Sequence, residues 1–273
     1  MTLQDLLDPT LDASQKGFPH HSGPLRRSAI GSQGWNVLRG DLPLPLAVIR
    51  RDALAGNLTW MQGFAGGHGV GLAPHGKTTM SPQLFQRQLA AGAWGLTFAT
   101  VVQQRAGVAA GATPCLIANQ VIRAIDLQGI DDLKRAPPGS SAATRLVGFE
   151  CYEGLGATGQ SDADTAYALA LMKRVRDIAL ACDAQQLFEA DEILLTAGGS
   201  AIFDLVADHL KLNLSRPVQG LLRSGCYVTH DHGFYRRMVN AVDQRLGCAG
   251  CNTGKGLRPA MEVWATVQSC PEP

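Results

Sequence analysis

Between residues 46 and 229, short apolar runs alternate with longer segments in which apolar residues recur every three or four positions. The short runs are continuously apolar, as expected of strands covered on both faces, and the longer segments have the periodicity of helices. This alternation predicts an α/β fold built on a parallel sheet. The seven expected strands are residues 46–51, 69–73, 94–100, 114–120, 146–154, 192–200 and 220–229.

The composition limits the classes of protein to consider. The chain has 273 residues, 45% of them apolar, and a formal net charge of +1. A length and apolar content of this size suit one large domain, and the near-neutral charge predicts neither a nucleic-acid nor a membrane partner. No apolar run reaches about 18 residues, and the acidic start of the chain does not resemble a signal peptide. The seven cysteines are odd in number, which favours reduced thiols and a cytoplasmic location.

One lysine stands where an expected strand meets an expected helix. The apolar run ending at Ala73 leads into a Pro74-His75-Gly76 turn, and Lys77 follows at once. Ser81 is well placed to cap the next helix, which runs over 82–91 with proline at its first position. A lysine just past the carboxyl end of a strand can form a Schiff base with a carbonyl cofactor. A solvated loop lysine is the alternative.

The stretch Pro-His-Gly-Lys-Thr followed by Ser-Pro, residues 74–82, resembles the lysine motif of a known enzyme branch. That branch is the D-serine dehydratase and amino-acid deaminase group of the alanine-racemase-type, or fold type III, enzymes, which also includes D-threonine aldolases. The resemblance implies a TIM-type (β/α) barrel with a C-terminal β domain, and pyridoxal 5'-phosphate (PLP) carried by Lys77. The family usually has arginine before the proline, where this chain has Ala73.

The same resemblance implies a PLP-dependent lyase, a deaminase or dehydratase, that acts on a D- or β-hydroxy amino acid such as D-serine. A D-threonine aldolase-like activity is the runner-up. A single-domain barrel that binds PLP without catalysis, or an inactive and incomplete homologue, remains open beside it.

A phosphate needs backbone N–H donors, and two glycine-containing stretches qualify. Gly198, Gly199 and Ser200 stand at the carboxyl end of an expected strand and precede a helix-like run, an arrangement that lets main-chain amides approach a phosphate. The family has the same Gly-Gly-Ser. Arg-Ser-Gly-Cys-Tyr, residues 223–227, resembles its second phosphate-side element, which implies contacts from Gly225 and Tyr227. For Tyr227, a core aromatic residue is an equally weighted interpretation.

Three further residues are expected at strand ends, on the side of the sheet where Lys77 lies. Tyr152 belongs to a Tyr-Glu-Gly stretch that matches the family and is expected to contact the cofactor. His75 lies two residues before Lys77 and is expected to bear on the cofactor ring. Gln120 is a further candidate.

No metal site is predicted. His230-Asp231-His232 places possible ligands in a row without a fourth elsewhere, and Cys248 and Cys251 form a single Cys-x-x-Cys pair where a structural zinc usually has two.

The chain departs from the family in two places. A linker-like stretch at 135–144 stands where relatives have two further strands and an arginine near the pyridine nitrogen. At about 30 residues per strand–helix unit, roughly 60 residues are absent, leaving about six of eight barrel strands. Residues 262–273 resemble only the first strand and turn of the C-terminal β domain.

We therefore expect an N-terminal extension over 1–45, a PLP-binding barrel over 46–235, and the start of a truncated β domain over 236–273. Residues 236–256 look irregular. A functional form is expected to be a homodimer.

Overall fold

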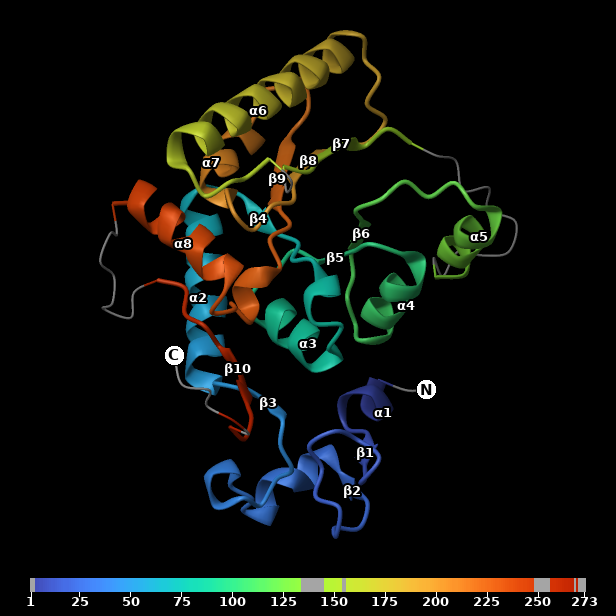
Figure 1. Ribbon diagram of the computed structural model, residues 1–273. Coiled ribbons are helices and arrows are strands. Elements are labelled where there is room, and N and C mark those ends of the chain that lie inside the picture. Colours follow the sequence, from blue (N-terminus) through green and yellow to red (C-terminus); the bar gives the residue numbers. More distant parts are fainter. Residues whose placement is uncertain (1–2, 134–144, 154–155, 248–255, 268, 270–273) are drawn as a thin grey trace.

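The computed structural model describes residues 3–133, 145–153, 156–247, 256–267 and 269. The expected α/β fold with a parallel sheet is confirmed (Figure 1). The strands of this sheet are β4 (Gly71–Leu72), β5 (Leu96–Phe98), β6 (Cys115–Ile117), β7 (Gly148–Cys151), β8 (Ile193–Ala197) and β9 (Val218–Leu222).

The strand order differs from the order along the chain. Four strands are hydrogen-bonded in the order β4-β9-β8-β7, and β5 pairs with β6; all these pairings are parallel. A bridge between His75 and Thr97 joins the two groups, with the Thr97 N–H donating to the Pro74 carbonyl at 2.9 Å. The six strands therefore run in the order β6-β5-β4-β9-β8-β7. Among the described residues no pairing joins β6 to β7, so a closed barrel is not seen.

Helices follow the strands as the periodicity predicted. They are α2 (Arg51–Gly67), α3 (Pro82–Ala90), α4 (Val101–Ala109), α5 (Ala124–Leu133), α6 (Ser161–Ala184) and α7 (Phe203–Val206), the last continued by the 3-10 helix η4 (Ala207–Leu210). The expected cap of α3 is confirmed, because Ser81 Oγ accepts from the Leu84 N–H at 3.4 Å and Pro82 begins the helix. Thr100 caps α4 in the same way.

The long helix α6 packs on a narrower stripe than its sequence suggests. The helical spacing of Tyr167, Leu171, Val175 and Ile178 predicts one buried face, but Ile178 is 51% exposed. The fully buried positions are Asp164, Ala168, Met172 and Ala179, where small or thin side chains let the helix approach the sheet.

Two expectations for the last third of the chain are wrong. The strand predicted over 220–229 ends at Leu222, and its second half is a loop with a 3-10 helix, η5 (Cys226–Val228). Residues 236–245, part of the stretch expected to be irregular, belong to α8 (Phe234–Arg245). The apolar residues of α8 recur at helical spacing and join the main core: Tyr235, Met238, Val239 and Val242.

The first strand lies outside the parallel sheet. β3 (Leu46–Ile49) pairs antiparallel with β10 (Met261–Trp264), so that Leu46 faces Trp264 and Ile49 faces Met261. Asn57 on α2 reinforces this closure, donating to the Arg258 carbonyl at 2.7 Å and accepting from the Arg258 N–H at 2.8 Å. Segments some 200 residues apart in the sequence thus form one small ladder.

Most of residues 3–45 lie below that ladder in Figure 1, whereas the helix at residues 3–7 lies nearer to α3. Residues 3–45 contain α1 (Leu3–Leu7), the pair β1 (Thr10–Leu11) and β2 (Leu25–Arg26), and the 3-10 helices η1 (Arg27–Gln33) and η2 (Val37–Arg39).

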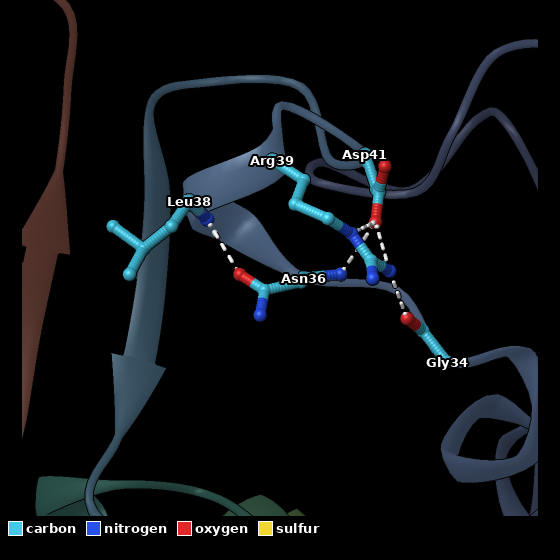
Figure 2. A network of polar contacts seen from close by, with 5 residues as sticks. All are labelled: Gly34, Asn36, Leu38, Arg39 and Asp41. Carbon is cyan, nitrogen blue, oxygen red and sulfur yellow. Dashed lines mark hydrogen bonds and ion pairs between the residues drawn. The ribbon is translucent and has the colours of Figure 1, made fainter.

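A local network of polar contacts orders the turn around η2 (Figure 2). The carboxylate of Asp41 accepts from the Asn36 N–H at 2.8 Å and from Arg39 Nη2 at 2.8 Å, and Asn36 Oδ1 accepts from the Leu38 N–H at 2.8 Å. Because these groups are exposed to water, the network shapes the loop and adds little stability. In the described part of the chain, no helix has the length and apolar character needed to cross a bilayer.

Candidate functional site

The loops that carry the expected site residues follow neighbouring strands of the sheet. β4, β9, β8 and β7 are adjacent and parallel, so their carboxyl ends meet along one edge. Lys77 follows β4, Gly225 follows β9, the Gly198–Ser200 stretch follows β8, and Tyr152 follows β7. In open and closed parallel sheets, this edge is where ligands bind.

Lys77 sits in the 3-10 turn η3 (Gly76–Thr78), directly after β4. Its neighbour Gly76 is buried, and a Cβ placed there would lie 2.5 Å from Phe98 Cε1. Only glycine therefore lets the turn settle on the aromatic core. Lys77 itself is exposed and has no ion pair among the described residues, so its amine is not committed to a carboxylate.

His75 joins this turn to the loop after β9. Its N–H donates to the Arg223 carbonyl at 3.0 Å, and its side chain is partly buried with Nδ1 lacking a hydrogen-bond partner among the described residues. Burial, and then the positive charges of Lys77 and Arg223, lower the pKa of His75 to about 4. The imidazole is therefore neutral at pH 7.

The Gly198–Ser200 turn is joined to the loop after β9 by side-chain hydrogen bonds. Ser200 Oγ accepts from the N–H groups of Gly225 and Cys226, both at 3.3 Å, and Ser224 Oγ donates to the Gly199 carbonyl at 2.6 Å. The amide of Gly225, expected to face a phosphate, is thus next to the hydroxyl of Ser200.

Gly225 also touches the lysine turn. A Cβ at this position would lie 2.5 Å from the His75 carbonyl oxygen and 2.7 Å from Thr78 Oγ1. Glycine is required here by close approach. The Lys77 turn, the Gly225 loop and the Ser200 turn therefore form one continuous cluster.

The loop after β7 closes the other side of the glycine turn. Tyr152 is 60% exposed, and its Cδ2 lies 3.2 Å from where a Cβ of Gly198 would be. Glu153 is fully buried, and a Cβ on Gly199 would lie 1.6 Å from its Oε1. Gly154, the last residue of the Tyr-Glu-Gly stretch, lies outside the described residues.

Glu153 is a site residue that we did not expect. Neither of its carboxylate oxygens has a partner with hydrogen-bond geometry among the described residues, although the N–H groups of Gly198 and Gly199 lie close to it. Burial raises the pKa of this carboxyl, an effect partly offset by its own N–H, by Arg223 and by the N–H groups of Gly198 and Gly199. An acidic side chain thus rests against the two glycines in an environment that favours its neutral form.

Arg223 is the second unexpected residue. It is 1% exposed and lies across the carboxyl ends of the strands, donating to Thr196 Oγ1 and, at 2.9 Å, to the Cys151 carbonyl. Its Nη2 is 3.4 Å from Glu150 Oε1. The sequence does contain a signal for Arg223, because this residue begins the Arg-Ser-Gly-Cys-Tyr stretch. That stretch, however, implied site roles only for Gly225 and Tyr227.

Two expected residues lie elsewhere. Tyr227 is in η5, 1% exposed within the main core, with its hydroxyl beside Gln88 and its pKa raised to about 12 by burial. Gln120 follows β6, two strands away from β4 in the sheet, and is exposed. The structure does not bring Gln120 to the cluster around Lys77.

Two stretches, residues 230–232 and the Cys248–Cys251 pair, were considered as possible metal sites. His230 is 2% exposed, with Nδ1 2.9 Å from the Asp231 carbonyl and its ring edge-on to Tyr235. Cys248 and Cys251 lie outside the described residues. Within the described ranges, no three His, Cys, Asp or Glu side chains are gathered as metal ligands would be.

Comparison with known proteins gives fold-level neighbours. No family model and no curated protein matches the sequence. The D-threonine aldolase from Filomicrobium marinum superimposes with a TM-score of 0.67 at 20% identity, over 85% of this chain and 72% of that one. The H351A mutant of D-threo-3-hydroxyaspartate dehydratase gives 0.55 at 21% identity, over 86% and 68%. The metal-free C353A mutant of D-threo-3-hydroxyaspartate dehydratase gives 0.51 at 22% identity, over 81% and 67%. The chain therefore shares its fold with a D-threonine aldolase and with a D-threo-3-hydroxyaspartate dehydratase.

Proposed function

We propose that this chain is a PLP-dependent lyase that acts on a D- or β-hydroxy amino acid such as D-serine, with Lys77 holding the aldehyde of the cofactor. The observation that carries the proposal is the convergence of Lys77, Ser200 and Gly225 at the carboxyl ends of adjacent parallel strands. The fold-level neighbours are named for activities on hydroxy amino acids, one an aldolase and one a dehydratase.

The residues present fit the chemical needs of PLP. An exposed amine without an ion pair among the described residues suits an aldehyde, and a Gly-Gly-Ser turn at the carboxyl end of a strand offers main-chain amides to a phosphate. When bound, PLP supplies an electron sink for the bond broken at the α-carbon.

The chain's own residues prepare this environment. His75 is uncharged at neutral pH, so it adds no positive charge beside Lys77. Burial favours the neutral form of Glu153, which reduces its repulsion of a phosphate at the same glycine turn. Ser200 and Ser224 hold the two phosphate-side loops together.

A second candidate function is PLP binding without turnover. The exposure of Lys77 and of Tyr152 favours it, because catalysis of this kind benefits from exclusion of water. A D-threonine aldolase-like activity is the alternative within the lyase class, consistent with the fold of the neighbour that bears this name.

The test is a titration of the purified chain with PLP, followed by visible absorbance. Reduction with borohydride and peptide mass analysis would then locate the label. We expect a saturable band and label on Lys77 in the wild type, loss of both in Lys77→Ala, and no change in Lys173→Ala, an exposed lysine on α6. Labelling that survives in Lys77→Ala contradicts the proposal.

Addition of D-serine and of D-threonine to the loaded protein separates the candidates. Keto acid and ammonia from D-serine indicate a dehydratase, and glycine with an aldehyde from D-threonine indicates an aldolase. A band without either product indicates the binding function.

A further inference from the structure

A cavity of about 320 Å³ lies where the N-terminal segment meets the start of α2 and one side of α3. Three arginines line it: Arg27 from η1, Arg51 at the start of α2, and Arg87 on α3. They come from three separate elements, and all three are exposed, so the cavity is open to solvent.

The three guanidinium groups have no ion pair among the described residues. One carboxylate lies near Arg27: the pKa of Asp8 is lowered by the Ser28 N–H and, to a smaller extent, by the charges of Arg26 and Arg27, so Asp8 partly balances Arg27. Asp8 accepts from the N–H and hydroxyl of Ser28 at 2.7 and 2.9 Å, and Asp52 lies 3.5 Å from Arg258. No acidic side chain lines the cavity. Arg51 and Arg87 have no ion pair among the described residues, and this excess of positive charge raises the local potential and attracts anions.

The rest of the cavity is suited to an apolar body. Ile49, Leu54 and Leu84 form part of its lining. Cavities that bind small molecules are mostly apolar with a few polar groups for orientation, and they begin at about 300 Å³. The cavity therefore matches a small molecule that carries both an apolar portion and a charged end.

The wall of the cavity is held in place before any ligand arrives. Arg27 Nε donates to the Leu7 carbonyl at 2.6 Å, and Gln83 Nε2 donates to the Leu6 carbonyl at 2.9 Å. The first bond fixes Arg27 to α1 within the N-terminal segment, and the second attaches that segment to α3. Pre-organisation of this kind lowers the entropic cost of binding.

We propose that this cavity binds a small organic oxyanion, a phosphate ester or a carboxylate with an apolar body. Guanidinium groups bind both of these anions through paired N–H donors, and arginine suits them better than lysine because its donors are fixed in a fork. The proposal concerns residues that have no part in the PLP site, so it does not depend on the proposed function.

The test uses the full chain, isothermal calorimetry and phenyl phosphate as the probe. We expect saturable binding that weakens with added salt, and about a tenfold higher Kd in each of Arg51→Ala and Arg87→Ala, from the loss of one charge-assisted contact. Arg176→Ala, which removes an exposed arginine of α6, is the matched control and should bind as the wild type does. Because all three side chains are exposed, the variants should melt like the wild type.

Two further probes distinguish the sources of the anion. Benzoate in place of phenyl phosphate tests a carboxylate, and inorganic phosphate tests whether the apolar body is needed. Binding at the Gly198–Ser200 turn would be unchanged in the Arg51 and Arg87 variants, so it cannot be mistaken for this site. Absence of binding by the wild type, or equal affinity in the wild type and both variants, overturns the proposal.

Discussion

The main-chain N–H of His75 donates to the carbonyl oxygen of Arg223 at 3.0 Å. This bond continues the β4–β9 ladder one step past its last strand residues, since the Ala73 N–H also donates to the Leu222 carbonyl at 2.9 Å. The turn that carries Lys77 is therefore positioned by the loop after β9. Substitutions in that loop should therefore displace the turn that carries Lys77, even though Lys77 itself is unchanged.

Substitution Gly225→Ala tests this coupling. A Cβ would lie 2.5 Å from the His75 carbonyl oxygen, so either the loop or the lysine turn must move. We expect a loss of about 1–3 kcal/mol in the free energy of unfolding, measured with urea, together with weaker PLP binding. Gly63→Ala on α2 is the control, because a Cβ there meets nothing within 4 Å; it should stabilise the helix by about 0.5–1 kcal/mol. A Gly225→Ala variant as stable as the wild type would contradict the close approach.

Replacement of Glu153 by glutamine should stabilise the chain at neutral pH. Burial raises the pKa of this carboxyl in the folded state, so its contribution to stability is present below the unfolded value and is lost as pH rises through the folded pKa. The free energy of unfolding of the variant, relative to that of the wild type, should therefore increase by about 1 kcal/mol or more as pH rises from 4 to 8. Urea denaturation at several pH values measures the difference. If the gap between the two proteins were independent of pH, Glu153 would not carry a raised pKa.

His75 should make stability depend on pH in the opposite direction. Its folded pKa of about 4 lies below the unfolded value near 6.5, so the unfolded chain binds the proton first. Stability therefore falls as pH drops from about 6.5 to 4. In His75→Gln, this part of the dependence should disappear, an effect of about 1 kcal/mol after allowance for solvent screening. His21→Gln, at an exposed histidine of the N-terminal segment, should retain the wild-type profile.

Arg223→Met should destabilise the fold even though it removes a buried charge. The hydroxyl of Thr196 and the carbonyl of Cys151 would lose their donor inside the protein, and Glu150 would lose its partner. We expect a loss of about 3 kcal/mol in the free energy of unfolding. Arg223→Lys should fall between the wild type and Arg223→Met, because an ammonium keeps the charge without the fork. Equal stability of Arg223→Met and the wild type would show that these contacts contribute nothing.

The positions of Lys77, Ser200 and Gly225 could be predicted because strands alternate with helices, and the carboxyl ends of parallel strands share an edge. Local features that depend on a single side chain could be predicted equally well. The N-cap of α3 at Ser81 is an example. The strand order was not accessible, since the pairing of β4 with β9 joins residues about 150 positions apart. Arg223 was missed because arginine is usually exposed, and its burial depends on partners from two other strands.

The helix α8 shows a different cause of failure. Its apolar residues are interrupted by Arg236, Arg237 and other polar side chains, so the segment resembles a solvated loop unless the spacing of Tyr235, Met238 and Val242 is counted. The burial of that stripe against the core distinguishes it from a loop.

The antiparallel pairing of β3 with β10 has a consequence for synthesis on the ribosome. Leu46 emerges early, but its partner Trp264 is added more than 200 residues later. Until then β3 presents unpaired amides and carbonyls, an edge that neighbouring nascent chains can recognise. At elongation rates of about 5–20 residues per second, this interval lasts at least about 10 seconds. A chaperone that shields the region around residues 46–49 during that time should raise the yield of folded chain.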